Sequence, residues 1–379
     1  MKILYIVNDL SSTNGWSTYA CHLIEEAVRH GHDVHVVVER EIAYVNPRVS
    51  QYAVLAPPLT LLWNPLGIYM QWITVRRVLE GVAPDVVHVI VEPYVLLFAF
   101  ARTPVPLVLT VHGTYATLPR SVPQGMKRRM STYLFMRALK KVQKVICVSE
   151  ATQKKFLAAS YGFGGQEVCV IHNAIELPKA EISTEKKDDG QISVLTVGEV
   201  KRRKGIHDAI AVLSAWADLH EKPVVYTVAG HLDERNPYVA MVKKMAEEAT
   251  SSYFSVRFLG KVDDEEKTQL HQHASLYIHL ERVDTTTVEV EGFGISVLEA
   301  ASWGVPTLAA RGSAVSEAVD DGVSGYVVDL GDARGIDRAL TNLLLSPILT
   351  KAGILAWAKS HAINRIYTHV DAVYQSLCR

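Results

Sequence analysis

Short runs of apolar residues alternate along the chain with longer stretches in which apolar residues recur at helical spacing. The short runs are typical of buried parallel strands and the longer stretches of amphipathic helices, so the pattern predicts βαβ units. The strands predicted in the first half are Ile3–Val7, Asp33–Val38, Val86–Ile90, Leu107–Val111 and Lys144–Val148. Those predicted in the second half are Ile192–Val197, Val224–Ala229, Val256–Leu259, Leu276–Leu280, Thr307–Ala310 and Gly325–Val328.

A polar stretch without hydrophobic periodicity, Leu177–Gly190, separates the two halves. It predicts an interdomain linker over residues 179–190, between one Rossmann-like domain over 1–178 and another over 191–362. The predicted fold class is therefore α/β, with two doubly wound domains facing each other across a cleft. Ligands of such sheets bind outside the carboxyl ends of the strands, so the functional residues should lie there. The last segment, 363–379, is helical in pattern.

Composition narrows the class of protein. A chain of 379 residues is long enough for two domains with separate cores. Its 49% hydrophobic and 21% charged content is typical of a soluble globular protein, and a net charge of −1 excludes a general polyanion binder. The scattered cysteines lack metal-ligand spacing and are expected to be reduced thiols in the cytoplasm. No run reaches the roughly 18 apolar residues of a membrane span, and Met1–Val7 has the pattern of a strand rather than a signal peptide.

The most informative segment is Glu291-Gly-Phe-Gly-Ile-Ser-Val-Leu-Glu299, in which two acids flank a glycine-rich turn. Gly292 and Gly294 allow a tight bend and a close approach of the backbone to a ligand, and Ile295–Trp303 is predicted to be a short helix. Helix amides at such a turn favour phosphate, whereas carboxylates accept hydrogen bonds from sugar hydroxyls. A ligand with phosphates in its middle and hydroxyls at both ends is a nucleotide sugar.

This segment resembles the paired-glutamate motif of the family 4 retaining glycosyltransferases, which have the GT-B fold, and the whole chain fits that comparison. The resemblance implies that a hexose-type sugar is transferred, with retention of anomeric configuration, from a nucleotide-sugar donor to a glycan, a lipid-linked molecule or a small molecule. It implies that Glu299 holds the ribose hydroxyls and Glu291 the sugar hydroxyls. The turn residues expected around the donor are Gly292, Phe293, Gly294 and Ile295. We expect a UDP- or GDP-sugar as donor, no separate cofactor, and a last helix that returns to the N-terminal domain.

Four consecutive basic residues, Lys201–Lys204, follow the first strand of the second half and precede a predicted helix. Cations at a helix N-terminus oppose the helix dipole, and a bound anion would relieve that conflict. The segment resembles the phosphate-binding turn of the family, which implies that Lys204 and Arg203, with Arg202, neutralise the leaving diphosphate. Glu199 departs from the family, which usually has arginine there. Either a neighbouring arginine supplies the missing charge, or the transferase activity is weakened or lost.

Further candidates lie in the first half. His112 ends a predicted strand, and the resemblance implies that it contacts the sugar beside the reacting centre. A neutral imidazole can donate a hydrogen bond to a hydroxyl or to a developing oxyanion. Gly15, in the loop after the first strand, is expected to let the backbone approach the donor. Ser149 and Asn173 match donor-side positions but fit turn and capping roles equally well, and His88 fits a structural role as well as a functional one.

Residues 104–149 contain no acidic residue but many basic ones, interleaved with apolar side chains. An anionic membrane surface attracts such a segment by about 1 kcal/mol per basic residue near it. The basic residues concerned are Arg120, Lys127, Arg128, Arg129, Arg137, Lys140 and Lys141. The prediction is a peripheral protein on the inner face of the cell membrane that makes polysaccharide or glycolipid; a solvated helix face is the alternative. Nucleic acid is not expected, because no nucleic-acid-binding motif accompanies the segment.

The chain lacks the Asp-X-Asp pair of metal-dependent transferases, so we expect a metal-independent reaction in which Lys204, an adjacent arginine and helix amides carry the leaving charge. Two other classes stay open. One is a binding protein on the same scaffold that holds a nucleotide sugar without turning it over, which Glu199 motivates. The other is a phosphorylase or sugar epimerase of the same architecture. The sequence does not identify the base, the sugar, the acceptor or the role of the loop 281–290.

Overall fold

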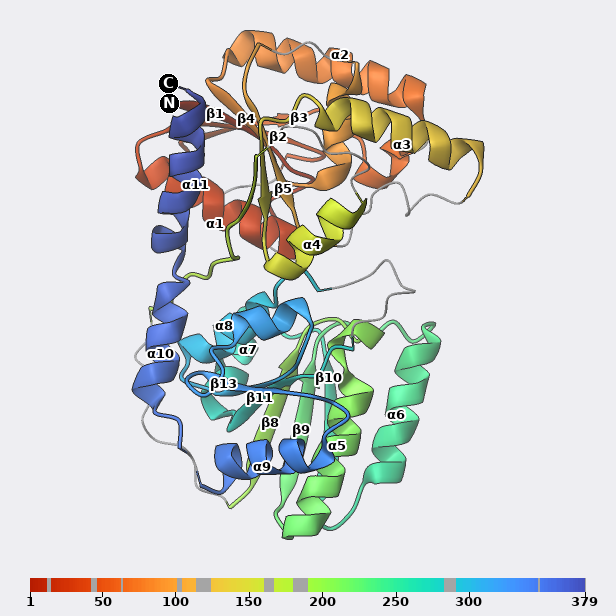
Figure 1. Cartoon of the computed structure of the whole chain (residues 1–379), viewed down its shortest axis with the longest axis vertical. Coiled ribbons are helices and arrows are strands. Elements are labelled where there is room, and N and C mark those ends of the chain that lie inside the picture. The colour runs from red at the N-terminus through yellow and green to blue at the C-terminus, as the bar shows by residue number, and fades with distance from the viewer. Residues whose placement is uncertain are drawn as a thin grey trace. The chain divides into compact units, whose positions relative to one another are not determined.

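The computed structural model describes residues 1–11, 15–41, 46–62, 64–100, 104–113, 124–159, 167–179, 190–282, 291–346 and 348–378. They form two compact units, each built on a parallel sheet with helices along its faces (Figure 1). Unit 1 comprises Met1–Glu176, Thr285–Gly292 and Ala362–Arg379, and unit 2 comprises Leu177–Asp284 and Phe293–His361. The predicted domain limits and the linker 179–190 stay predictions, and residues 180–189 lie outside the described ranges.

The sheet of unit 1 has the strand order β3-β2-β1-β4-β5-β6-β7, and every pair is parallel. The order reverses between β1 and β4, so the loops after these two strands diverge at a topological switch point, where ligands of open α/β sheets bind. The strands are β1 Lys2–Ile6, β2 Asp33–Val38, β3 Val49–Ala53, β4 Val86–Val89, β5 Leu107–Val111, β6 Lys144–Cys147 and β7 Glu167–Val170. The helices are α1 Gly15–Arg29, η1 Pro58–Leu61, α2 Pro65–Val82, η2 Glu92–Ala99, α3 Met126–Leu139, α4 Glu150–Ala159 and α11 Ile363–Leu377.

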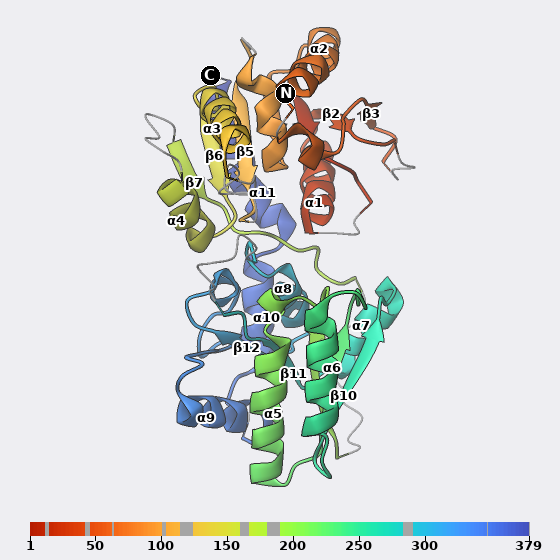
Figure 2. The ribbon, with the colours of Figure 1, turned by 90° about the vertical axis from the view of Figure 1, so that its right-hand side faces the viewer.

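The sheet of unit 2 has the order β10-β9-β8-β11-β12-β13 and reverses between β8 and β11. Its strands are β8 Ile192–Val197, β9 Val224–Ala229, β10 Phe254–Gly260, β11 Leu276–His279, β12 Thr307–Ala310 and β13 Gly325–Val328. Its helices are η4 Arg202–Lys204, α5 Ile206–His220, α6 Pro237–Ala249, α7 Asp264–His273, α8 Ile295–Ser302, η5 Ala314–Ala318, α9 Ala333–Leu344 and α10 Lys351–Ser360. Helices α5 and α6 lie side by side along one face of this sheet (Figure 2).

The last helix, α11, belongs to unit 1 and packs against α1, which confirms the predicted return of the chain (Figure 1). Tyr367, Val370 and Tyr374 are buried in the unit 1 core. The Tyr374 hydroxyl lies 2.6 Å from His88 Nδ1, while His88 Nε2 lies 2.7 Å from Thr110 Oγ1. Both ring nitrogens of His88 are thus used inside the core, and burial lowers its pKa to about 3. His88 therefore has the structural role that the sequence left open.

The predicted strands are all present within about two residues of their predicted ends, a usual margin for such boundaries. The hydrophobic pattern predicts neither β3 nor β7, which are the two edge strands of the unit 1 sheet. Their burial is correspondingly weaker, because an edge strand packs against a neighbour on one side only. None of the described helices is both long enough and apolar enough to cross a membrane.

Candidate nucleotide-sugar site

The basic turn of unit 2 starts at the carboxyl end of β8. Gly198 follows this strand with φ of +138°, and a Cβ atom there would lie 2.8 Å from Lys204 Cε, so glycine leaves the room that the Lys204 side chain occupies. Lys204 is 8% exposed. Gly205 closes the turn at φ of +65°, and a Cβ atom there would lie 2.0 Å from the Leu280 carbonyl oxygen. The turn is therefore packed tightly between the ends of β8 and β11, at the switch point.

The other basic residues of the turn are placed differently. Arg202 is exposed, and its guanidinium carbon lies 5.7 Å from the centre of the Tyr238 ring, a cation–π distance. Arg203 is half-buried. Lys201 Nζ lies 2.9 Å from Glu199 Oε2. The acid that departs from the family pattern is thus paired with a lysine of the same turn.

The first turn of α8 lies at the same end of the unit 2 sheet. Gly294 is its N-cap residue, in the left-handed region at φ of +101°. The Tyr277 hydroxyl accepts a hydrogen bond from Val197 N at 3.2 Å and lies 2.8 Å from Ser296 Oγ, which connects the end of β8 to the start of α8. Amides at a helix N-terminus attract anions. The Lys204 turn and the first turn of α8 therefore both lie at the end of β8, a combination that suits phosphate.

Glu299 lies one turn further along α8 and is half-buried. Lys267 Nζ lies 3.4 Å from its Oε1 and 3.5 Å from Asp264 Oδ1. Burial lowers the pKa of Lys267, but the two carboxylates outweigh it and the net shift is upward. The capping box of Asp263 and Glu266 fixes the start of α7 and hence the position of Lys267. Lys267 was not among the predicted residues, and its position in sequence carries no signal of its contact with Glu299.

His112 follows β5 in unit 1. Burial lowers the pKa of its ring to about 4, against the opposite effect of a hydrogen bond to the Ile90 main chain. Among the described residues Nε2 has no partner. Nδ1 therefore donates to the Ile90 carbonyl, because a carbonyl only accepts, and Nε2 carries a lone pair. In this tautomer His112 accepts a hydrogen bond from a hydroxyl and does not donate one to an oxyanion, which narrows the predicted role.

The remaining motif residues divide between the units. Glu291 and Gly292 group with unit 1, whereas Phe293 begins a part of unit 2. A Cβ atom at Gly292 would lie 2.1 Å from the His112 carbonyl oxygen, so this glycine is required by backbone packing. Glu291 and Ile295 are half-buried. Phe293 is 1% exposed, with its ring 6.0 Å from the His361 ring, so its side chain is a core residue of unit 2.

Three further candidates lie in unit 1. The buried Ser149 hydroxyl accepts from Thr152 N at 2.9 Å, so it caps α4. Asn173 is 4% exposed, and its Oδ1 has no partner among the described residues. Gly15 begins α1, and a Cβ atom there would lie within 4 Å of none of the atoms in the described ranges. The roles of all these residues toward a donor stay predictions.

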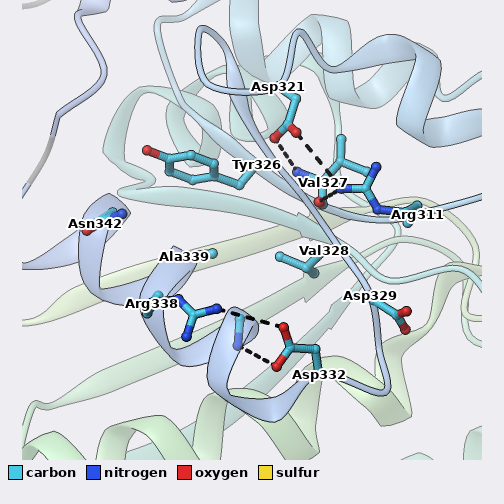
Figure 3. A pocket seen from close by; sticks show the side chains of 11 residues that line it. Arg311, Asp321, Tyr326, Val327, Val328, Asp329, Asp332, Arg338, Ala339 and Asn342 are labelled. Carbon is cyan, nitrogen blue, oxygen red and sulfur yellow. Dashed lines mark hydrogen bonds and ion pairs between the residues drawn. The ribbon is translucent and has the colours of Figure 1, made fainter.

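A separate polar pocket of about 400 Å³ lies beside α9 at β13, an edge strand of unit 2 (Figure 3). Its polar groups are used locally. Arg311 Nη2 donates to the Val327 carbonyl at 2.8 Å, and Val327 N donates to Asp321 Oδ1 at 2.9 Å. These side chains cover an otherwise open sheet edge. Asp332 caps α9 and lies 3.8 Å from Arg338. The pocket contains none of the predicted site residues.

Two doubly wound sheets, with a basic turn and a glycine-capped helix at the switch point of the second, define a protein of the GT-B class. Two family models together match residues 13–354: "Glycosyltransferase Family 4" over residues 13–179 and "Glycosyl transferases group 1" over residues 179–354. The chain therefore belongs to family 4 of the glycosyltransferases.

Similar proteins support this membership. A glycogen synthase of Mycobacterium tuberculosis is 27% identical over 270 residues, which is 70% of this chain and 61% of that protein. A phosphatidyl-myo-inositol mannosyltransferase of Mycobacterium leprae is 25% identical over 76% of this chain and 71% of its own length. The structure of Anabaena HepE in complex with UDP and glucose superposes with a TM-score of 0.71 at 20% identity, covering 99% of this chain and 100% of that one. That likeness shows the GT-B fold.

Proposed function

We propose that this chain is a retaining, metal-independent glycosyltransferase that moves a hexose-type sugar from a nucleoside diphosphate sugar to a glycan, lipid-linked or small-molecule acceptor. The observation that carries the proposal is Lys204, a buried lysine at the end of β8 beside the start of α8. A buried cation at the same strand end as a helix N-terminus suits a leaving diphosphate, whose charge grows in the transition state. Family membership supports the same class of reaction.

The donor-binding roles follow from the chemistry of each group. Lys204, with Arg202 and Arg203, and the α8 amides would neutralise the diphosphate, while Glu299, held by Lys267, would accept from the ribose hydroxyls. His112 Nε2 would accept from a sugar hydroxyl. The solved complex of HepE with UDP and glucose supports a UDP-hexose. A GDP-mannose-dependent mannosyltransferase of Mycolicibacterium smegmatis, 34% identical over 111 residues, supports a GDP-hexose as the second candidate.

The alternative is a protein that binds a nucleotide sugar without turning it over. Glu199 motivates it, since a free carboxylate beside the diphosphate would oppose departure of the leaving group. The Lys201–Glu199 ion pair weakens this alternative, because the lysine compensates that charge.

Donor turnover tests the proposal. UDP-, GDP-, ADP- and dTDP-sugars are supplied with chelator present, and released nucleotide is measured for the parent and for a Lys204→Met variant. Release from one donor by the parent, strongly reduced in the variant, is the expected result. Thermal stabilisation by one donor without release, also in the presence of glycan and lipid acceptors, would favour the binding protein.

We also propose that unit 1 meets an anionic membrane through α3, which would place the protein at the cytoplasmic face of the cell membrane. Lys127, Arg129 and Lys140 are exposed, together with Met126 at 84% and Tyr133 at 60%. Two of the predicted basic residues have structural partners: Arg137 Nε donates to the Ala99 carbonyl and Lys141 Nζ to the Phe98 carbonyl, each at 2.7 Å. Arg120 lies outside the described residues.

Co-sedimentation with vesicles tests the membrane contact. We expect binding to vesicles that contain anionic phospholipid, weaker binding to neutral vesicles, and loss of binding when Lys127 and Arg129 are both changed to Glu. Changing Lys243 and Lys244, surface lysines on α6 of unit 2, to Glu provides the matched control. Equal sedimentation with neutral and anionic vesicles would exclude the contact.

A further inference from the structure

Glu92 is a buried acid that is not among the residues predicted from the sequence. It begins η2 directly after β4, at the switch point of unit 1, and is 1% exposed. Buried carboxylates usually pair with a cation. Glu92 instead bonds to main-chain amides: His112 N donates to its Oε1 at 2.7 Å, and the amides of Gly113 and of Glu92 itself also contribute. Its Oε2 has no partner among the described residues.

The segment 90–92 thus holds His112 in two ways. The Glu92 carboxyl binds the backbone of the His112–Gly113 turn, and the Ile90 carbonyl accepts from the His112 ring. The His112 and Tyr19 rings pack edge to face, with their centres 5.0 Å apart. The direction of the Nε2 lone pair is therefore set by groups at the end of β4, not by the turn alone.

The turn has little freedom on its other side. The His112 carbonyl lies against Gly292, where even a Cβ atom would approach to 2.1 Å, and the Gly292 carbonyl accepts from Thr152 Oγ1 at 3.2 Å. Main-chain packing therefore limits the movement of the turn on this side.

We propose that Glu92 is a positioning residue for the transfer reaction: its carboxyl holds the His112–Gly113 turn so that His112 Nε2 accepts a hydrogen bond from a hydroxyl of the donor sugar. This inference rests on the proposed function, since it needs a sugar at His112. Glu92 acts through His112 and does not itself contact the donor.

Ionisation of Glu92 should be detectable at His112, which gives a direct test of the contact between them. Burial raises the pKa of its carboxyl to about 7, against the opposite effect of its amide partners. The titratable groups around it are neutral near that pH, because burial lowers the pKa of His112 to about 4 and of His88 to about 3 and raises that of Cys147 to about 12. A change sensed at His112 near pH 7 would therefore report Glu92.

Kinetics separate positioning from general stability. We expect Glu92→Met to lower kcat by about tenfold to a hundredfold, as misplacement of a reacting group does, with donor KM within about twofold. Glu92→Gln, which keeps an acceptor for His112 N, should have a kcat within about threefold of the parent.

The double variant tests whether Glu92 acts through His112. In a His112→Ala background, Glu92→Met should have almost no further effect on kcat, because residues acting as a unit are not additive. Glu26→Met, a change to a buried acid 2% exposed in α1, is the matched control and should leave kcat near the parent value. An equal loss with and without His112 would overturn the proposal.

Nuclear magnetic resonance of ¹⁵N-labelled histidine gives a readout that needs no turnover. We expect the parent to show the Nδ1-protonated tautomer at His112, with an inflection near pH 7 that is absent from Glu92→Gln. A His112 signal in the parent that does not respond between pH 5 and 9 would overturn the role of Glu92. If the parent turns over no donor, the proposed function fails, while this titration still decides whether Glu92 controls His112.

Discussion

The strand ends that carry the predicted site residues are built differently in the two units. In unit 1, His112 and Glu92 are buried, lack ionic partners among the described residues and are held by main-chain groups. In unit 2, Lys204 and Glu299 lie in a turn and a helix that also carry ion pairs, Lys201 with Glu199 and Lys267 with Glu299. In both units a glycine with φ in the left-handed region follows the strand closely: Gly113 lies two residues after β5, and Gly198 lies directly after β8.

Under the proposed function, this difference corresponds to the two parts of the donor. A diphosphate is charged, so the surface that binds it needs fixed cations and helix amides. A sugar brings neutral hydroxyls, for which a neutral imidazole of defined tautomer is sufficient. Because its groups are buried and neutral, the stability of unit 1 should depend on whether Glu92 ionises. Unit 2 should instead lose activity when a charged side chain is removed.

The largest effect should appear in the pH dependence of stability. The pKa of Glu92 is raised by burial to about 7 from 4.5, so the parent loses stability as pH rises from 4.5 to 7, because the unfolded chain ionises first; above pH 7 the loss is constant. Glu92→Gln removes this term. The free energy of unfolding of the variant should therefore rise by up to about 3 kcal/mol relative to the parent between pH 4.5 and 8. Denaturant unfolding of the whole chain, followed at the transition of unit 1, measures it. A difference that is independent of pH would contradict a neutral Glu92.

Lys204→Met should come next and act on the charged end. The change removes the ammonium but keeps most of the side-chain volume against Gly198, so the fold should be retained. We expect kcat to fall about a hundredfold, the usual cost of losing one group that stabilises transition-state charge. The control is Lys243→Met, which removes a surface lysine of the same unit outside the turn and should change kcat by less than about threefold. Similar effects of the two variants would mean that loss of one positive charge, and not the position of Lys204, lowers kcat.

Glu299→Ala should act on binding of the donor. Loss of the carboxylate that accepts from the ribose should raise donor KM by about tenfold with a smaller change in kcat. Lys267→Met should raise KM less, about threefold, because it only orients Glu299 and the pair is partly exposed. Steady-state kinetics with the donor found by turnover distinguish the two. A larger effect of Lys267→Met than of Glu299→Ala would mean that the lysine contacts the donor itself.

The smallest effect is expected at Glu199. Its ion pair with Lys201 already compensates the charge, so Glu199→Gln should change kcat by less than about threefold. A rise of tenfold or more would show that this carboxylate restrains the leaving group, and would support the weakly active protein that the sequence left open.

The sequence predicted strands best where both faces are buried. β4 and β5 are buried at every position and read as continuous apolar runs. β3, with the sequence Val-Ser-Gln-Tyr-Ala, and β7 show no such run, because they form the edges of the sheet. Their pairing depends on the neighbouring strand, which is not local information.

The site residues follow the same division. Lys204, His112 and the Glu291–Glu299 segment could be found because motif residues stand at fixed places after strands. Glu92 had one signal, a lone acid inside the apolar run Val86–Phe100, but its partner His112 is 20 residues away in sequence. Lys267 and Glu299 are 32 residues apart, and their contact depends on how α7 and α8 pack.

By itself, the sequence determined the two doubly wound domains, the family, and which residues stand at the carboxyl ends of the strands, because periodicity, glycines and charged runs are local properties of a chain. The tertiary structure alone decided that the His112 ring is buried and neutral, that its main-chain amide donates to Glu92, and that Lys267 pairs with Glu299. These depend on burial and on contacts between segments distant in sequence, and burial, through desolvation, determines which protonation state a group adopts.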